Sequence, residues 1–119
     1  GAGQTQRLPR LIPLAKAFEM LFLAERMNAQ DALAIGLVNA MVPLARLMET
    51  ADEWAAKICA NAPLAMQATK EAVLRGLTLP IAEGLQLERE LAAPVNLTED
   101  SQEGVRAFAE GRRPQFKGR

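Results

Sequence analysis

The chain has 119 residues, half of them apolar, and its 14 Lys and Arg balance its 14 Asp and Glu, so no net charge attracts nucleic acid or a membrane surface. It has no histidine and one cysteine, Cys59, which excludes an internal disulfide, a Ser-His-Asp triad, a cysteine-based zinc cluster and a His-ligated metal site. No signal peptide or apolar run of roughly 20 residues is visible, and the Ala- and Leu-rich usage favours helix, so we expect a mostly helical, cytoplasmic domain.

The chain begins with GAGQTQRLPR. A dinucleotide-binding loop would need a third glycine where Gln6 stands, and a phosphate-binding loop would need Gly-Lys-Ser/Thr at its end. A simple turn before a helix is therefore preferred over a nucleotide loop. Within it, Thr5 is predicted to cap a short turn that Pro9 and Pro13 keep irregular.

Residues 14–23, LAKAFEMLFL, are predicted to form a helix that is apolar nearly all round. Leu14, Phe18 and Phe22 share one face, and Leu23 makes the other side apolar too. Such a helix is usually buried on several sides. A self-contained domain of this size offers few such places, which indicates a neighbour outside the chain.

The next stretch, RMNAQDALAIGLVNAMVP, carries helix boundary signals. Asn28 is predicted to cap a helix with Asp31 in its first turn and Gly36 just beyond its end. The run LVNAMV, residues 37–42, is the one segment that reads as a strand. Because a lone strand leaves its backbone groups unpaired, this run either pairs with polypeptide outside the chain or is an irregular connector.

The middle of the chain is predicted to form three more helices, and the first carries an apolar stripe that includes Trp54. Pro63 and Pro80 stand at the starts of the second and third, where proline is tolerated. Gly76 is expected to end the second helix and Pro94 the third. The predicted ranges are 44–61, 63–75 and 81–92.

An acid–base pair needs two carboxyl groups that converge in a pocket, and the carboxylates of the first helices are candidates for one. Glu19, Glu25 and Asp31 all have Lys or Arg near them in the sequence. Glu88 and Glu90 are typical of a hydrated helix face. Solvated charges are the preferred interpretation for all five.

The final segment begins at Thr98, which is predicted to cap a helix. Phe108 and Phe116 then alternate with arginines and lysines. A guanidinium can bind phosphate through two hydrogen bonds, and an aromatic ring can cover the face of an adenine. The alternative is a frayed basic end in which Phe108 is a buried core anchor. The residues after Gln115 are expected to be loose.

Five stretches in order resemble one family: GAGQTQRLPRL, AERMNAQDALAIGLVNAMVP, ANAPLAMQATKEAV, EGLQLEREL and TEDSQEGVRAFAEGRRPQFKGR. They resemble the C-terminal half of the enoyl-CoA hydratase/isomerase (crotonase) family and span about the last 45% of a member. The resemblance implies the helical C-terminal region of an α/β spiral fold, with at most one short strand in this chain. Residues 1–43 would end the core, with an active-site edge loop, two helices and a short strand. Residues 44–119 would form a helical region for oligomerisation and CoA covering.

The resemblance implies an acyl-CoA thioester substrate, a trimeric or hexameric assembly, and no cofactor or metal beyond the coenzyme A of the substrate. Enoyl-CoA hydratase is the preferred activity. The alternatives are an isomerase or other crotonase-type enzyme, and a non-catalytic helical oligomerisation fragment. Both catalytic glutamates and both oxyanion-hole donors of the family are expected upstream, so this chain alone is predicted to be inactive.

The family's functional residues match only a few positions here. Gly1 matches a glycine whose backbone N–H helps to hold the catalytic water. Phe108 matches the aromatic residue near the adenine, and the basic residues Arg112, Arg113 and Lys117 fall near the CoA phosphates. The sequence also departs from the family: Gly111 stands where many members have a phosphate-binding lysine, Asn96 replaces a common aromatic residue, and Gln4 replaces a glycine.

Overall fold

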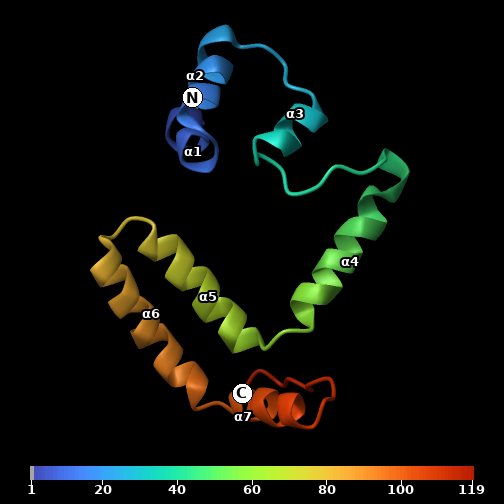
Figure 1. Ribbon diagram of the computed structural model, residues 1–119, viewed down its shortest axis with the longest axis vertical. Coiled ribbons are helices and arrows are strands. Elements are labelled where there is room, and N and C mark those ends of the chain that lie inside the picture. The colour runs from blue at the N-terminus through green and yellow to red at the C-terminus, as the bar shows by residue number, and fades with distance from the viewer. Residues whose placement is uncertain (1) are drawn as a thin grey trace. The chain divides into compact units, whose positions relative to one another are not determined.

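The computed structural model describes residues 2–119, which form α-helices, one 3-10 helix and connecting loops (Figure 1). Chain contacts divide the protein into two compact units, residues 1–50 and 51–119. The elements are α1 (Gln4–Leu11), α2 (Leu14–Leu23), α3 (Ala29–Ala34), η1 (Leu44–Arg46), α4 (Leu47–Cys59), α5 (Pro63–Gly76), α6 (Ile81–Asn96) and α7 (Glu99–Ala109).

A turn starts α1, as the glycines of the opening segment predicted. Gly3 has a φ of 78°, and its carbonyl accepts hydrogen bonds from the N–H groups of Gln6 and Arg7. The predicted cap at Thr5 is wrong, because Thr5 lies inside the helix. Pro9 also lies inside α1. Its missing N–H removes one hydrogen bond of the helix, but the helix continues past it, and the Ile12 N–H donates to the Leu8 carbonyl.

The predicted helix at residues 14–23 is confirmed as α2, which packs against α1. Its predicted burial on several sides is not found among residues 2–119. Ala17 is buried, but Phe22 is 77% exposed and Leu23 is 59% exposed. The ring centroids of Phe18 and Phe22 lie 5.1 Å apart, so the two side chains contact each other while both remain exposed.

The boundaries of α3 match their sequence signals. The Asn28 side chain accepts a hydrogen bond from the Asp31 N–H at 2.8 Å, and Gly36 has a φ of 77° just beyond the helix. Residues 37–42 form no strand in this structure: residues 37–39 are bends and residues 40–42 have no regular structure, which agrees with the alternative of an irregular connector. A strand needs a partner, and residues 2–119 contain no strand that could pair with this run.

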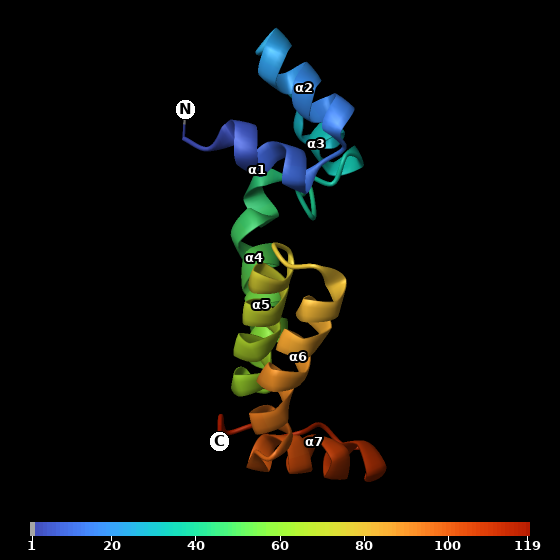
Figure 2. The ribbon, with the colours of Figure 1, turned by 90° about the vertical axis from the view of Figure 1, so that its left-hand side faces the viewer.

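In the second unit α5 and α6 form an antiparallel hairpin and lie side by side along their length (Figures 1 and 2). Pro63 begins α5, as predicted. Gly84 of α6 lies beside the end of α5: a Cβ added there would lie 3.9 Å from the Gly76 carbonyl oxygen, an ordinary van der Waals distance. The prediction that Pro94 ends α6 is wrong: the helix continues to Asn96, since a proline in the last turn removes only one of its hydrogen bonds.

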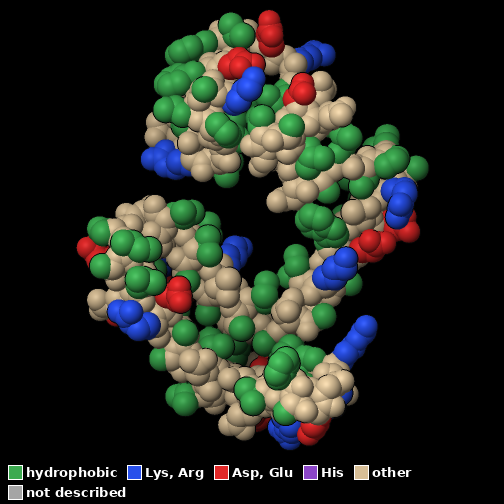
Figure 3. Space-filling view, viewed as in Figure 1, with side chains coloured by type: hydrophobic (Ala, Val, Ile, Leu, Met, Phe, Trp, Pro, Cys, Tyr) green, Lys and Arg blue, Asp and Glu red, His purple; other side chains and the backbone are tan. Residues whose placement is uncertain are grey.

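Apolar side chains cover much of the surface of both units (Figure 3). Leu87 and Ala107 are the buried apolar residues of the second unit, and no large side chain of residues 2–119 is below 2% exposed. The most exposed apolar side chains are Leu44, Leu77, Ile81, Leu97 and Phe108. The helices therefore present apolar faces that the described residues leave uncovered.

Candidate functional site

The candidate site lies at α7 and the segment that follows it. Thr98 caps the helix as predicted, since its Oγ1 accepts a hydrogen bond from the Ser101 N–H at 3.1 Å. At the other end Gly111 has a φ of 65°. The Gly111 N–H donates to the Phe108 carbonyl and the Arg112 N–H to the Ala107 carbonyl, the two bonds of a Schellman motif. This turn directs the chain back toward the start of α7.

We call residues 112–119 the C-terminal strap. Asp100, only 3% exposed, accepts hydrogen bonds from the Lys117 N–H at 2.6 Å and the Gly118 N–H at 2.7 Å. The Asp100 N–H in turn donates to the Arg119 main-chain oxygen at 3.0 Å. The prediction of a loose end after Gln115 is therefore wrong, because a buried carboxylate binds the strap to the first turn of α7.

A second carboxylate holds the beginning of the strap. Glu103 accepts two hydrogen bonds from the Arg112 guanidinium, at 2.6 and 3.0 Å, and one from the Gln115 N–H at 2.9 Å. The Arg112 hydrogen bonds, followed by the Gln115 N–H, lower the pKa of Glu103 to about 2. Arg112 also contacts Glu110 at 2.5 Å, and these two partners raise its pKa above the ordinary value.

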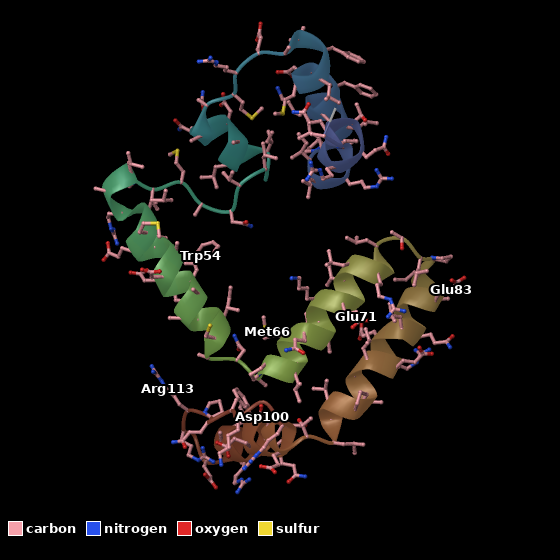
Figure 4. The ribbon with its side chains drawn as sticks, turned by 180° about the vertical axis from the view of Figure 1, so that it is seen from behind. Trp54, Met66, Glu71, Glu83, Asp100 and Arg113 are labelled. Atoms are coloured by element: carbon pink, nitrogen blue, oxygen red, sulfur yellow. The ribbon has the colours of Figure 1, made fainter. Side chains whose placement is uncertain are left out.

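The predicted binding residues have different surroundings. Phe108 is 91% exposed, which excludes the alternative of a buried core anchor in this structure. Arg113 and Lys117 are exposed, with no ion-pair partner within residues 2–119, whereas Arg112 is held by its two carboxylates. Figure 4 shows Asp100 among the side chains of α7 and the strap, and Arg113 at the outer edge, pointing away from the helix. The Gly1 prediction lies outside the described residues.

α7 and the strap enclose a polar hollow of about 400 Å³. Its walls carry both positive and negative side chains. Arg106 and Arg112 are already paired with Glu103 there, so much of the positive charge is neutralised within the protein. The lining includes Asp100, Glu103, Arg106, Arg112 and Lys117.

The carboxylates of the first unit do come together. Glu19, Glu25 and Asp31 line one hollow of about 140 Å³ beside Arg26. All three are exposed, and Glu19 pairs with Lys16 at 2.7 Å, which raises the pKa of that lysine. This arrangement agrees with solvated charges and offers no buried acid–base pair.

No group of three or more His, Cys, Asp or Glu in residues 2–119 could hold a metal ion. Within that range no helix combines the length and the apolar character that crossing a bilayer requires.

Sequence reasoning missed the roles of Asp100 and Glu103. Their position in the first turns of a helix is fully explained by the helix dipole, so the residue type gave no separate signal. Their partners are backbone N–H groups and an arginine 9 to 18 residues away, and such contacts leave no periodic pattern. In the structure, the φ of 75° at Gly118 and its closeness to Pro63 fit a segment folded back on the protein, but neither is visible in the sequence.

Comparison with known proteins gives consistent matches. The enoyl-CoA hydratase/isomerase family model matches residues 1–119. The short-chain-enoyl-CoA hydratase of Clostridium acetobutylicum is 42% identical, over all of this chain and 46% of the relative. The (E)-benzylidenesuccinyl-CoA hydratase of Thauera aromatica is also 42% identical, over 99% of this chain and 46% of the relative.

Solved structures agree with these matches. The crystal structure of an enoyl-CoA hydratase from Bacillus anthracis has a TM-score of 0.96 and 44% identity, covering all of this chain and 46% of that one. The chain thus spans about half the length of the relatives it matches. With the family model covering its full length, the chain belongs to the enoyl-CoA hydratase/isomerase family.

Proposed function

We propose that this chain is part of an enzyme that adds water to a 2-enoyl-CoA thioester. The observation that carries the proposal is the family match over residues 1–119, together with relatives of about 40% identity that are named as hydratases of enoyl-CoA compounds. The coenzyme A belongs to the substrate, and the proposal needs no other cofactor and no metal. A cytoplasmic location is part of the same proposal.

We further propose that the chain forms the C-terminal half of that enzyme, with the acid–base groups on polypeptide that precedes it. The five motifs quoted above support this placement. So does the state of the carboxylates: those of the first unit are exposed, and Asp100 and Glu103 are engaged in holding the strap. None of them stands free in an apolar pocket, where a general acid or base is usually tuned.

The same proposal gives roles to the exposed residues of α7 and the strap. The Phe108 ring, 91% exposed, offers a face on which the adenine of coenzyme A can stack. Arg113 and Lys117 offer exposed cations to its phosphates. Arg112 is proposed to contribute positive charge nearby, although its hydrogen bonds are already directed to Glu103 and Glu110. Gly1 is proposed to help hold the attacking water.

The test is hydration of crotonyl-CoA, followed through the loss of the conjugated thioester absorbance. The whole enzyme that carries this chain should turn over, and the 119-residue chain alone should not. Turnover by the pure chain would contradict the placement of the acid–base groups. Failure of the whole enzyme to hydrate any 2-enoyl-CoA would contradict the proposed reaction.

An enoyl-CoA isomerase is the second candidate, because the family description joins both activities and a relative from Mycosarcoma maydis, 34% identical, is named an isomerase/hydratase. The substrate decides between them. A 3-enoyl-CoA converted to its 2-isomer, without formation of the hydroxyacyl product, would favour the isomerase. A protein that associates but neither binds nor converts an acyl-CoA would favour the non-catalytic oligomerisation module.

A further inference from the structure

The end of the strap, residues 117–119, is attached to α7 mainly through Asp100. Its Oδ1 accepts the Lys117 N–H and its Oδ2 the Gly118 N–H, while its own N–H donates to Arg119. Hydrogen bonds to a charged acceptor are stronger than neutral ones, and this acceptor is 97% shielded. Two bonds to the Asp100 side chain and one from its backbone N–H therefore fix the last residues of the strap to a single residue in the first turn of α7.

Glu103 holds the beginning of the strap through Arg112 and the Gln115 N–H, but beyond Gln115 little other than Asp100 restrains the chain. Phe116 is half-buried over Gly104, and Gly118 lies near Pro63, but the remaining strap side chains are exposed. The Arg119–Glu99 ion pair is exposed on both sides, and surface pairs of this kind add little. A segment with few buried contacts belongs to the parts of a protein that open first, unless a specific anchor holds it.

The anchored backbone carries exposed positive charge. The Lys117 N–H is bound by Asp100, yet its side chain is exposed and has no ion-pair partner within residues 2–119. Arg112 and Arg119 are both engaged with carboxylates of α7, Glu103 and Glu99 respectively. Asp100 thus fixes the main chain at the position from which the Lys117 ammonium extends.

We propose that Asp100 is a positioning residue that holds the strap so that Lys117 meets the phosphates of an acyl-CoA. The role of Lys117 rests on the proposed function, whereas the anchoring by Asp100 does not. Asp100 itself does not touch the ligand. Binding to a loose strap would have to order that segment, so losing the anchor weakens binding and leaves the reacting centre unchanged.

The kinetic consequence is specific. The thioester and the acid–base groups lie away from the strap in the proposed enzyme, so loss of the anchor affects substrate and transition state equally. Such a change raises KM and leaves kcat unchanged. We expect Asp100→Ala to raise both the KM for crotonyl-CoA and the Kd for coenzyme A about tenfold, with Asp100→Asn in between, because its amide keeps one acceptor oxygen.

The experiment uses the whole enzyme that carries this chain, as wild type, Asp100→Ala, Asp100→Asn and the control Asp52→Asn. Asp52 is an exposed residue of α4, so its replacement makes the same chemical change without touching the strap. Hydrogen exchange measures the strap amides against those of α5 and α6, calorimetry measures the Kd for coenzyme A, and turnover gives kcat and KM.

The proposal expects faster exchange at the amides of residues 117 and 118, which donate to Asp100, in Asp100→Ala, unchanged exchange in α5 and α6, and a raised KM at constant kcat. Strap exchange at the wild-type rate would overturn the anchor. A loss of protection throughout the unit in both Asp100 variants would overturn it too, since the carboxylate would then support the whole fold.

The two proposals fail differently. A wild-type enzyme that binds no coenzyme A contradicts the proposed function and the positioning role with it, while hydrogen exchange still decides whether Asp100 holds the strap. An enzyme that binds coenzyme A equally well with a loosened strap contradicts the positioning role alone. A fall in kcat in Asp100→Ala would also overturn it, because a binding segment away from the chemistry should not alter that step.

Discussion

A single hydroxyl group begins α7. Thr98 Oγ1 accepts the Ser101 N–H at 3.1 Å and donates to the Val95 carbonyl at 2.7 Å, so it joins the end of α6 to the next helix. Replacing a threonine cap by alanine leaves a helix N–H without its partner. We expect Thr98→Ala to lower the free energy of unfolding by about 1 kcal/mol in urea titrations of the enzyme. Thr98→Ser is the control and should retain most of the stability, because its hydroxyl can make both bonds.

Glu103 gives the protein an acid-sensitive contact. Its pKa is lowered to about 2 from the value of 4.5 for a free side chain, first by Arg112 and then by the Gln115 N–H. A lowered folded-state pKa means that the stabilising contribution is fully present above 4.5 and is lost as the pH falls toward 2. A glutamine side chain is uncharged at every pH, so at this position it cannot form the ionic contact with Arg112.

We therefore expect Glu103→Gln to be less stable than wild type at pH 7 and the difference to shrink between pH 4.5 and 2. Urea unfolding across that range measures it, with hydrogen exchange at the Gln115 amide as the local readout. The exposed residue Glu53 of α4 supplies the matched control, Glu53→Gln, whose difference from wild type should stay nearly constant. A difference for Glu103→Gln that does not change with pH would contradict the ionic role of this contact.

At the scale of the helices, two glycines at helix ends should respond to alanine in opposite directions. Gly111 adopts a φ of 65° in the turn that starts the strap, a conformation that strains any residue with a Cβ. Gly76 is the last residue of α5, has no positive φ, and a Cβ there would meet no atom within 4 Å. The backbone conformation at each glycine therefore decides whether alanine raises or lowers the free energy of unfolding.

We expect Gly111→Ala to destabilise the protein by about 1 kcal/mol and Gly76→Ala to stabilise it by about 0.5 kcal/mol. Thermal or urea unfolding of the two variants measures both signs. Gly111→Asn should recover part of the loss, since asparagine tolerates the left-handed region better. Equal effects at the two positions would show that the turn after α7 does not need its left-handed residue.

Local signals predicted helix starts well and some helix interiors poorly. Asn28 and Thr98 cap their helices through side-chain oxygens, an interaction that depends on residues only three positions away. Pro9 and Pro94 were expected to disrupt helices but lie inside α1 and α6. Each removes one hydrogen bond near a helix end, and whether a helix tolerates that loss depends on packing that the local sequence does not report.

The candidate site was only partly predictable for a related reason. A resemblance over the whole chain indicated Phe108 and the basic residues, and composition excluded histidine and cysteine chemistry. The anchoring of the strap depends on contacts across 17 and 18 residues between Asp100 and two backbone amides. Any residue other than proline supplies such an amide, so no residue type marks the contact in advance.

On the scale of the whole chain, the main physical feature is apolar surface that stays exposed. Phe22 on α2, Leu77 and Ile81 around the turn between α5 and α6, and Leu97 before α7 are all at least 77% exposed. Soluble monomers seldom leave so many large apolar side chains uncovered, and grouped exposed apolar surface commonly marks an interface. This surface supports the proposed contacts with the remaining half of the enzyme and with other subunits.

We expect the 119-residue chain alone to associate with itself as its concentration rises, and the whole enzyme to form one defined trimer or hexamer. Sedimentation velocity over a wide range of concentrations measures both, and binding of an apolar fluorescent dye should be strong for the chain and weak for the enzyme. Ile81→Ser serves as the test variant, since Ile81 is 79% exposed and removing its apolar side chain should reduce association without creating a cavity. Val95 lies in the groove between α5 and α6, so Val95→Ser controls for a general loss of stability. A chain that stays monomeric and binds no dye at every concentration would contradict the idea that these faces are interfaces.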